Sequence, residues 1–296
     1  MTGAAVFAVF AVLMIMPSGV TPLAKSDVWS FAAHHGVVQR LSVRGPADSS
    51  WHSVWVWRPP GPDSARIPVL YFLHGNPGDA HNAFGHGLAA VLDVRLEEGY
   101  PPFIVACPDG NGEHRWDTEW ADSADGSDMV ESRLLDAVIP VVEGRHRRGA
   151  PRRAIAGFSM GGYGAMNIAL RHPKLFGQIV SIAGYFHVDD PASMFAGSQA
   201  LIAANSPELH LDMARGKRIM LAEDRSDDLA VIRGQAASFE AMLDRARIPA
   251  TLRITAGRHD WVYATAALAD AVDFVADGWQ RIAAASARAR PAGRGR

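Results

Sequence analysis

A serine in a glycine-rich motif is the residue of this sequence best suited to covalent chemistry. Residues 157–161 read Gly-Phe-Ser-Met-Gly, between an apolar run at 154–156 and a run typical of a helix. This motif between a strand and a helix predicts a nucleophile elbow, a sharp turn that exposes the hydroxyl of Ser159. Met160 would begin the helix and aim its backbone N–H at a developing oxyanion. A glycine-rich turn without a chemical role is the alternative.

A histidine after the last predicted strand is the candidate general base. His259 stands in a loop that contains Gly257 and follows the predicted strand 251–255. It also comes after Ser159 in the chain, as expected where a triad runs serine, acid, histidine. The alternative is a loop histidine without a catalytic role.

The acid of the predicted triad must come from a short acidic segment between these two residues. Residues 223–228 read Glu-Asp-Arg-Ser-Asp-Asp and directly follow a predicted strand. One ionised carboxylate should accept a hydrogen bond from Nδ1–H of His259 and stabilise the imidazolium. Adjacency to the strand favours Asp224, whereas counting back from the Ile-Pro pair at 248–249 favours Asp228. We predict Asp224, with Asp228 as the alternative.

A second oxyanion donor is expected from the loop that follows an early strand. Residues 73–78 read Leu-His-Gly-Asn-Pro-Gly and end the apolar run 69–73. Asn76 holds the position for a backbone N–H donor, because Pro77 has no N–H. The alternative for this loop is that His74 binds a metal together with other histidines. We expect no metal, because no spacing such as His-Glu-x-x-His is present.

Two tryptophans follow a glycine-rich turn at the predicted carboxyl end of another strand. Trp116 and Trp120 stand in the segment 115–120, and ligands of open α/β sheets bind at this edge. We predict that both tryptophans form a wall of the substrate pocket. The alternative is that they cover loop backbone.

The elements that position these residues begin with a hairpin. Residues 37–44 and 51–57 alternate in polarity around a turn at 45–48, which predicts two antiparallel strands. From residue 67 onward, short apolar runs alternate with helical segments, which predicts a mostly parallel sheet covered by helices on both faces. The predicted strands are 69–73, 103–107, 154–158, 178–183, 218–222 and 251–255, and the predicted helices are 88–97, 129–143, 164–171, 229–246 and 263–284. Pro140 should kink its helix near the end.

Composition is typical of a globular protein with a sizeable core. The chain has 296 residues, 48% of them hydrophobic, and a formal net charge of −2, which argues against nucleic acid as the main partner. Cys107 is the single cysteine, so no internal disulfide can form, and its apolar surroundings predict a buried strand residue.

The two ends of the chain differ from the middle. Residues 4–16 are continuously apolar, as in the core of a signal peptide. We expect residues 1–24 to be a leader for export, which would make the protein either secreted or a component of the cell envelope. An uncleaved anchor or a cytoplasmic protein with a mis-assigned start is the alternative. We expect a single domain over 28–284 and a disordered basic tail at 285–296.

Together these motifs resemble the putative-esterase branch of the α/β-hydrolases, which includes S-formylglutathione hydrolases, feruloyl esterases and mycolyltransferases. The resemblance rests on Leu-His-Gly-x-x-Gly at 73–78, the motif at 157–165 and Gly-Arg-His-Asp-Trp at 257–261. It implies an α/β-hydrolase fold, Ser159 as nucleophile, His259 as base, and Asn76 and Met160 as the oxyanion hole. The sequence departs from the family at the acid, where the usual Gly-x-x-Asp is replaced.

The resulting expectation is a serine carboxylic-ester hydrolase that needs no cofactor and acts on a small-molecule, lipid or sugar ester. An acyltransferase of the mycolyltransferase type, with a sugar or lipid hydroxyl as acceptor, is the first alternative. A serine peptidase is less favoured because so short a chain has no gating domain. A catalytically silent binding protein with this fold is the third alternative. The sequence does not indicate an oligomeric state.

Overall fold

One nine-stranded sheet organises the part of the chain that the structure describes. The computed structural model describes residues 27–28 and 36–288. Along the sheet the strand order is β1-β2-β3-β5-β4-β6-β7-β8-β9, antiparallel up to the β3–β5 pair and parallel from there on. The strands are β1 (Asp27–Val28), β2 (Val37–Val43), β3 (His52–Arg58), β4 (Val69–Leu73), β5 (Ile104–Pro108), β6 (Arg153–Phe158), β7 (Gln178–Ile182), β8 (Arg218–Asp224) and β9 (Thr251–Thr255).

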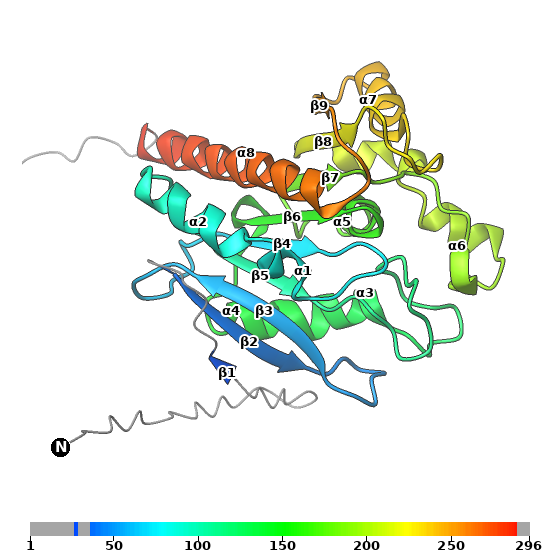
Figure 1. Ribbon diagram of the computed structural model, residues 1–296, viewed down its shortest axis with the longest axis horizontal. Helices are drawn as coiled ribbons and strands as arrows, with labels where there is room; N and C mark the ends of the chain where they lie inside the picture. The colour runs from blue at the N-terminus through cyan, green and yellow to red at the C-terminus, as the bar shows by residue number, and fades with distance from the viewer. Residues whose placement is uncertain (1–26, 29–35, 289–296) are drawn as a thin grey trace, which may run out of the picture.

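Helices cover both faces of this sheet, as Figure 1 shows for α2 and α8 on one side and α3 and α4 on the other. The α-helices are α1 (Asn82–Gly85), α2 (Leu88–Glu97), α3 (Val130–Arg133), α4 (Ile139–Glu143), α5 (Met160–Arg171), α6 (Gln199–Ala204), α7 (Gln235–Arg245) and α8 (Trp261–Arg288). A π-helical turn joins α3 to α4 at Leu134–Val138. Short 3₁₀ segments lie at Ala150–Arg152, Pro191–Ser193, Pro207–Leu209 and Leu211–Ala214.

The alternation of side chains along the central strands explains the two cores. In β4 all five residues are buried, because successive side chains enter opposite layers. Leu70 and Phe72 belong to the core that packs against α2 and α8. Tyr71 and Leu73 belong to the other core, which packs against α3, α4, α5 and α7. The predicted three-layer α/β arrangement is therefore observed.

The N-terminal hairpin forms as predicted. β2 and β3 pair antiparallel, and the pairing ends at Val43 opposite His52. Val54 and Val56 enter one core and Trp57 the other, so β3 is buried on both faces where it pairs with β5. Cys107 is a buried residue of β5, as expected, and burial raises the pKa of its thiol.

Several predicted elements differ from the structure. Helix α5 begins at Met160 rather than at residue 164, and α8 spans Trp261–Arg288 rather than 263–284. The helix expected at 129–143 is interrupted by the π-helical turn, which ends two residues before Pro140, a residue that cannot supply the N–H of a regular helical bond. Strand β8 continues to Asp224, two residues beyond the predicted end. Helix α7 begins at Gln235 rather than at residue 229, so a longer loop follows β8.

The two chain ends fall largely outside the described residues. The leader predicted at 1–24 lies outside them and stays a prediction. Helix α8 continues to Arg288, so residues 285–288 of the predicted tail are helical rather than disordered, and 289–296 lie outside the described residues. Within the described part of the chain, no helix combines the length and the apolar character that crossing a membrane needs.

A buried ion pair ties the sheet to the end of α4. Glu143 is fully buried and accepts hydrogen bonds from Nε and Nη2 of Arg153, at 2.5 and 2.8 Å. It also accepts from the backbone N–H of Arg148 at 2.7 Å and from the hydroxyl of Tyr71 at 3.2 Å. One carboxylate thus holds β4, β6 and α4 together.

Replacing this carboxylate tests its structural weight. We expect Glu143→Gln to lower the free energy of unfolding by about 3–5 kcal/mol, because the buried Arg153 would keep its charge without a counter-ion. Urea unfolding followed by circular dichroism measures the change. The matched control is Glu98→Gln, which removes a half-exposed pair with Arg95 and should cost about 1 kcal/mol or less. Equal losses in the two variants would contradict the assignment.

Candidate active site

The serine motif forms a sharp turn between β6 and α5. Ser159 has φ 57° and ψ −122°, a left-handed conformation that residues with a side chain rarely adopt. The turn is held by two backbone hydrogen bonds, from Ser159 N–H to the Ile182 carbonyl at 2.9 Å and from Tyr163 N–H to the Ser159 carbonyl at 3.0 Å. Ser159 therefore stands at the end of the sheet, at the start of a helix, as a nucleophile elbow requires.

Two glycines make this turn possible by close approach of backbone. A Cβ on Gly157 would lie 2.1 Å from the carbonyl oxygen of Gly161. A Cβ on Gly161 would in turn lie 2.1 Å from the carbonyl oxygen of Leu73, at the end of β4. Neither contact can be relieved by a side-chain movement, because both partners are backbone. This close approach of backbone is the physical reason for glycine at both positions.

The structure brings Ser159 and His259 into hydrogen-bond contact although 100 residues separate them. The Nε2 atom of His259 lies 2.9 Å from Oγ of Ser159, and Nδ1 lies 2.8 Å from Oδ2 of Asp227. With the hydrogen on Nδ1, the imidazole donates to Asp227 and accepts from the serine hydroxyl. This tautomer is the one in which a histidine can take the proton of a serine.

Packing fixes the plane of the imidazole in addition to these hydrogen bonds. The ring of Phe158 stacks on His259 with centroids 4.9 Å apart and an interplanar angle of 27°. Phe158 also contacts Trp261, which stacks on His86 at 4.6 Å. Phe158, which directly precedes Ser159 in the chain, thus also supports the ring of His259.

The acid position corrects the sequence prediction. Asp227, and neither Asp224 nor Asp228, contacts Nδ1 of His259. Because β8 continues through Asp224, this side chain is buried at the strand end and accepts the backbone N–H of Ser226 at 2.7 Å. Asp228 accepts the backbone N–H of His259 at 3.3 Å, so it contacts the loop rather than the ring.

Asp227 is also held in place by a hydrogen bond that does not involve His259. It is fully buried, and its Oδ1 accepts the backbone N–H of Leu229 at 2.9 Å. This bond leaves Oδ2 for His259. A carboxylate fixed in this way needs little reorganisation to stabilise an imidazolium, which is the role of a triad acid.

The loop expected to supply the second oxyanion donor lies against the serine turn. A Cβ on Gly75 would lie 3.0 Å from Cβ of Ser159, so the two backbones are in close contact. Asn76 lines the same pocket as Ser159 and Met160. The structure therefore brings together the predicted nucleophile, base and both predicted oxyanion residues.

His74 supports this loop through its backbone contacts. Its Nε2 accepts the N–H of Gly110 at 2.8 Å, and its Nδ1 lies 2.8 Å from the carbonyl of Gly75. Both nitrogens are therefore engaged with backbone. His81 and His86 pack against tryptophan rings instead of joining His74. The metal alternative for this loop has no support in these contacts.

The pocket at Ser159 has walls of two kinds. Its volume is about 290 Å³. One wall is apolar and comes from the loop before α7, and the other carries acidic and polar side chains from two loops. The lining residues are Asn76, Asp117, Glu119, Ser159, Met160, Tyr185, His187, Asp189, Leu229, Val231 and Ile232.

The predicted tryptophan wall is wrong. Trp116 is 66% exposed and is not among the residues that line the pocket. Trp120 is buried, donates its Nε1–H to the carbonyl of His74 at 3.0 Å, and packs over Gly110. Trp120 therefore covers loop backbone, which was the alternative. The residues between them, Asp117 and Glu119, face the pocket instead.

Glu119 is the most unusual ionisable group of this pocket. Burial raises its pKa to about 8, and the nearby carboxylate of Asp117 adds to the rise, whereas a hydrogen bond from the hydroxyl of Tyr185 opposes it. At neutral pH this carboxyl is therefore mostly protonated. It presents a neutral hydrogen-bonding group next to Ser159.

The family of the chain follows from comparison with known proteins. Residues 52–275 match the family described as "Putative esterase". The chain belongs to the putative esterase family. Esterase Rv1288 of Mycobacterium tuberculosis (strain ATCC 25618 / H37Rv) is 28% identical over 227 residues, which are 65% of this chain and 48% of that protein. The chain spans about half the length of the curated relatives it matches.

Solved structures similar to this esterase-family chain share its fold. A ferulic acid esterase has a TM-score of 0.71 at 22% identity, covering 82% of this chain and 98% of its own. An S-formylglutathione hydrolase from Agrobacterium tumefaciens has a TM-score of 0.72 at 22% identity, covering 86% and 99%. The predicted α/β-hydrolase fold and the predicted family are confirmed.

Sequence reasoning missed several residues of this esterase-family site. Asp227 was among the four acids considered, but only the length of β8 decides between them. For Glu119, the sequence offered an indication in the polar residues 117–119 between Trp116 and Trp120. Tyr185 and Ile232 come from loops whose path the sequence does not determine.

The pKa of Glu119 gives a testable pH dependence. Between its ordinary value of 4.5 and about 8, the folded protein keeps a proton that the unfolded chain has released. The free energy of unfolding should therefore fall by at most about 1.4 kcal/mol per pH unit across this range. Glu119→Gln lacks this pH-dependent contribution. The free energy of unfolding of the wild type should therefore fall relative to that of the variant as the pH rises from 5 to 8.

Urea unfolding at a series of pH values measures this difference. Glu98→Gln, which removes an exposed carboxylate paired with Arg95, serves as the control and should differ from the wild type by the same small amount at every pH from 5 to 8. A constant offset between Glu119→Gln and wild type from pH 5 to pH 8 would show that Glu119 titrates normally.

Proposed function

We propose that this protein is a serine carboxylic-ester hydrolase whose catalytic triad is Ser159, His259 and Asp227. The observation that carries the proposal is the continuous hydrogen-bonded path from Ser159 Oγ through the imidazole to Asp227, at 2.9 and 2.8 Å. The path opens on a pocket with an apolar and a polar wall. Membership of the esterase family supports the same reaction class.

In the proposed reaction, Ser159 attacks the ester carbonyl while Nε2 of His259 takes the hydroxyl proton. Asp227 accepts from Nδ1–H and stabilises the imidazolium. His259 then gives its proton to the departing alcohol, which leaves an acyl group on Ser159. A water molecule, activated by the same imidazole, discharges the acyl-enzyme and restores the serine.

The tetrahedral oxyanion of each step needs donors that are already in place. We assign this role to the backbone N–H groups of Met160, at the start of α5, and of Asn76. Each such donor contributes about 3 kcal/mol to transition-state stabilisation in hydrolases of this kind. The close packing of Gly75 against Ser159, and the pocket that Asn76, Ser159 and Met160 line together, support this assignment.

The charges of the pocket favour neutral or cationic esters over anionic ones. Asp117 and Asp189 line it, the carboxyl of Glu119 is mostly protonated at neutral pH, and among the described lining residues there is no lysine or arginine. A carboxylate on the substrate would face Asp117, which is partly shielded from water, and like charges repel more strongly there than in bulk water. We infer that the alcohol and acyl groups of the natural substrate carry no negative charge.

Triad variants test the reaction and the acid together. We expect Ser159→Ala to abolish hydrolysis of p-nitrophenyl esters and Asp227→Asn to lower kcat by about 10⁴, because the amide cannot hold the required tautomer. Asp224→Asn and Asp228→Asn are matched controls, since neither side chain contacts the ring, and both should lose less activity. A turnover rate of Ser159→Ala close to that of the wild type would contradict the proposed mechanism.

A fluorophosphonate probe checks the nucleophile independently of substrate choice. The wild type should be labelled at Ser159, and the Ser159→Ala variant should not be labelled. Equal labelling of the two proteins would assign the reactive group elsewhere.

The charge preference is tested with two matched pairs of esters. One pair is p-nitrophenyl hydrogen succinate and its methyl ester, and the other is 4-acetoxybenzoate and its methyl ester. We expect kcat/KM to be about tenfold lower or more for each anion, and Asp117→Asn to narrow the gap. Equal kcat/KM within both pairs would refute the inferred preference.

A further inference from the structure

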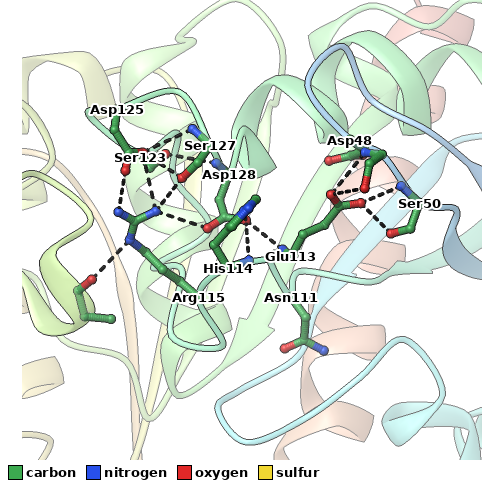
Figure 2. A network of polar contacts seen from close by, with 12 residues as sticks. Asp48, Ser50, Asn111, Glu113, His114, Arg115, Ser123, Asp125, Ser127 and Asp128 are labelled. Atoms are coloured by element: carbon green, nitrogen blue, oxygen red, sulfur yellow. Dashed lines mark hydrogen bonds and ion pairs between the residues drawn. The ribbon is translucent and has the colours of Figure 1, made fainter.

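A histidine and two carboxylates come together where the turn between β2 and β3 meets the loop after β5. Asp48, His52 and Glu113 each contribute one ligand atom, and these three atoms all lie within 4.8 Å of one another. None of the three lines the pocket at Ser159. Figure 2 shows the carboxylate of Glu113 directed at the turn that carries Asp48 and Ser50.

One ring nitrogen of His52 is buried without a hydrogen-bond partner. The side chain is 7% exposed, and Nε2 has no partner among the described residues. Nδ1 lies 3.2 Å from Oδ2 of Asp109, so the tautomer with hydrogen on Nδ1 donates to that carboxylate. The lone pair of Nε2 then faces Asp48 and Glu113. A buried nitrogen in this state requires a physical explanation.

The spacing of the three ligand atoms matches that around one metal ion. Nε2 of His52 lies 3.8 Å from Oδ2 of Asp48 and 3.9 Å from Oε1 of Glu113. Ligands bound at about 2.0–2.6 Å from a cation stand roughly 3–4.5 Å apart. These atoms can therefore share one ion after small side-chain movements.

Each ligand group is also held by neighbours in the way that metal ligands are. His52 donates to Asp109, which is the carboxylate–histidine arrangement that orients an imidazole toward a metal. Asp48 accepts the backbone N–H of Gly45 at 2.7 Å. Glu113 accepts hydrogen bonds from the hydroxyl of Ser49 at 2.6 Å and from the backbone N–H of Ser50 at 2.5 Å.

The local charge balance is negative. Asp48, Asp109 and Glu113 surround the imidazole, and the nearest cation paired with them is Arg133, whose Nη1 lies 3.2 Å from Oδ1 of Asp48. In this cluster three carboxylates face one guanidinium. A divalent cation would balance the remaining two negative charges.

We propose that Asp48, His52 and Glu113 bind one divalent transition-metal ion of the Zn²⁺ type. One imidazole nitrogen with two carboxylate oxygens is a donor set that suits Zn²⁺ and its neighbours better than Mg²⁺ or Ca²⁺, which prefer oxygen alone. The sequence did not predict this site, because Glu113 lies far along the chain from Asp48 and His52, which are only four residues apart.

The proposed ion lies at one end of a chain of contacts that reaches the loop beside Ser159. Oδ2 of Asp109 contacts Nδ1 of His52, and Oδ1 of Asp109 lies 3.6 Å from Nε2 of His74. His74 in turn holds Gly75, which packs against the serine turn. We infer that the ion stabilises the β2–β3 turn and the loop after β5, which carries Asp109, and that it takes no direct part in ester cleavage.

Isothermal titration of the full chain with Zn²⁺, after removal of metals by EDTA, tests the site. We expect one high-affinity Zn²⁺ per chain and a higher melting temperature in its presence. His52→Gln and Asp48→Asn should each weaken the affinity by at least about tenfold. Glu113→Gln provides a third variant if one of these fails to fold, which circular dichroism will show.

His114→Gln is the matched control, because this neighbouring imidazole is 61% exposed and contacts Asp128 instead of the cluster (Figure 2). It should bind Zn²⁺ as the wild type does, and so should Ser159→Ala, which separates this proposal from the proposed function. The proposal is overturned if the wild type binds no stoichiometric Zn²⁺. It is equally overturned if His52→Gln binds as tightly as the wild type, or if His114→Gln loses as much affinity as His52→Gln.

Discussion

The contact on which this site depends is the approach of the serine turn to the end of β4. Gly161 passes so close to the carbonyl of Leu73 that a single methyl group would not fit between them. Because this contact is made by backbone, it holds α5 over the centre of the sheet whatever side chains surround it. It also brings the loop after β4 beside Ser159, so backbone contacts alone hold the proposed nucleophile next to the loop that carries Asn76.

Residues governed by local rules could be predicted from the sequence. The glycines around Ser159, the apolar runs of β4 and β6, and the hairpin of β2 and β3 follow from steric and periodic requirements that a few neighbouring residues express. His259 was found because its strand and its order in the chain are also local features. The nucleophile, the base and the sheet that carries them were accessible for this reason.

The remaining residues depend on where elements end and how loops fold back. Two further residues in β8 place Asp224 inside the sheet and move the acid position to Asp227. Glu119 and Trp120 both have φ 51°, so the chain reverses there, which buries the tryptophan and turns the glutamate into the pocket. Hydrophobic periodicity carries no information about such conformations, and none about the long-range meeting of His52 with Glu113.

The proposed triad spans the sheet from its middle to its edge. Ser159 follows β6, which has neighbours on both sides, whereas His259 follows β9, the last strand of the sheet, most of whose residues are exposed. Edge elements with few buried contacts open locally at a lower free energy than the global unfolding of a domain. We therefore expect the proposed base to separate from the serine while the centre of the sheet stays folded. Hydrogen exchange at the amides of β9 would report such local opening more directly than the melting temperature of the whole protein.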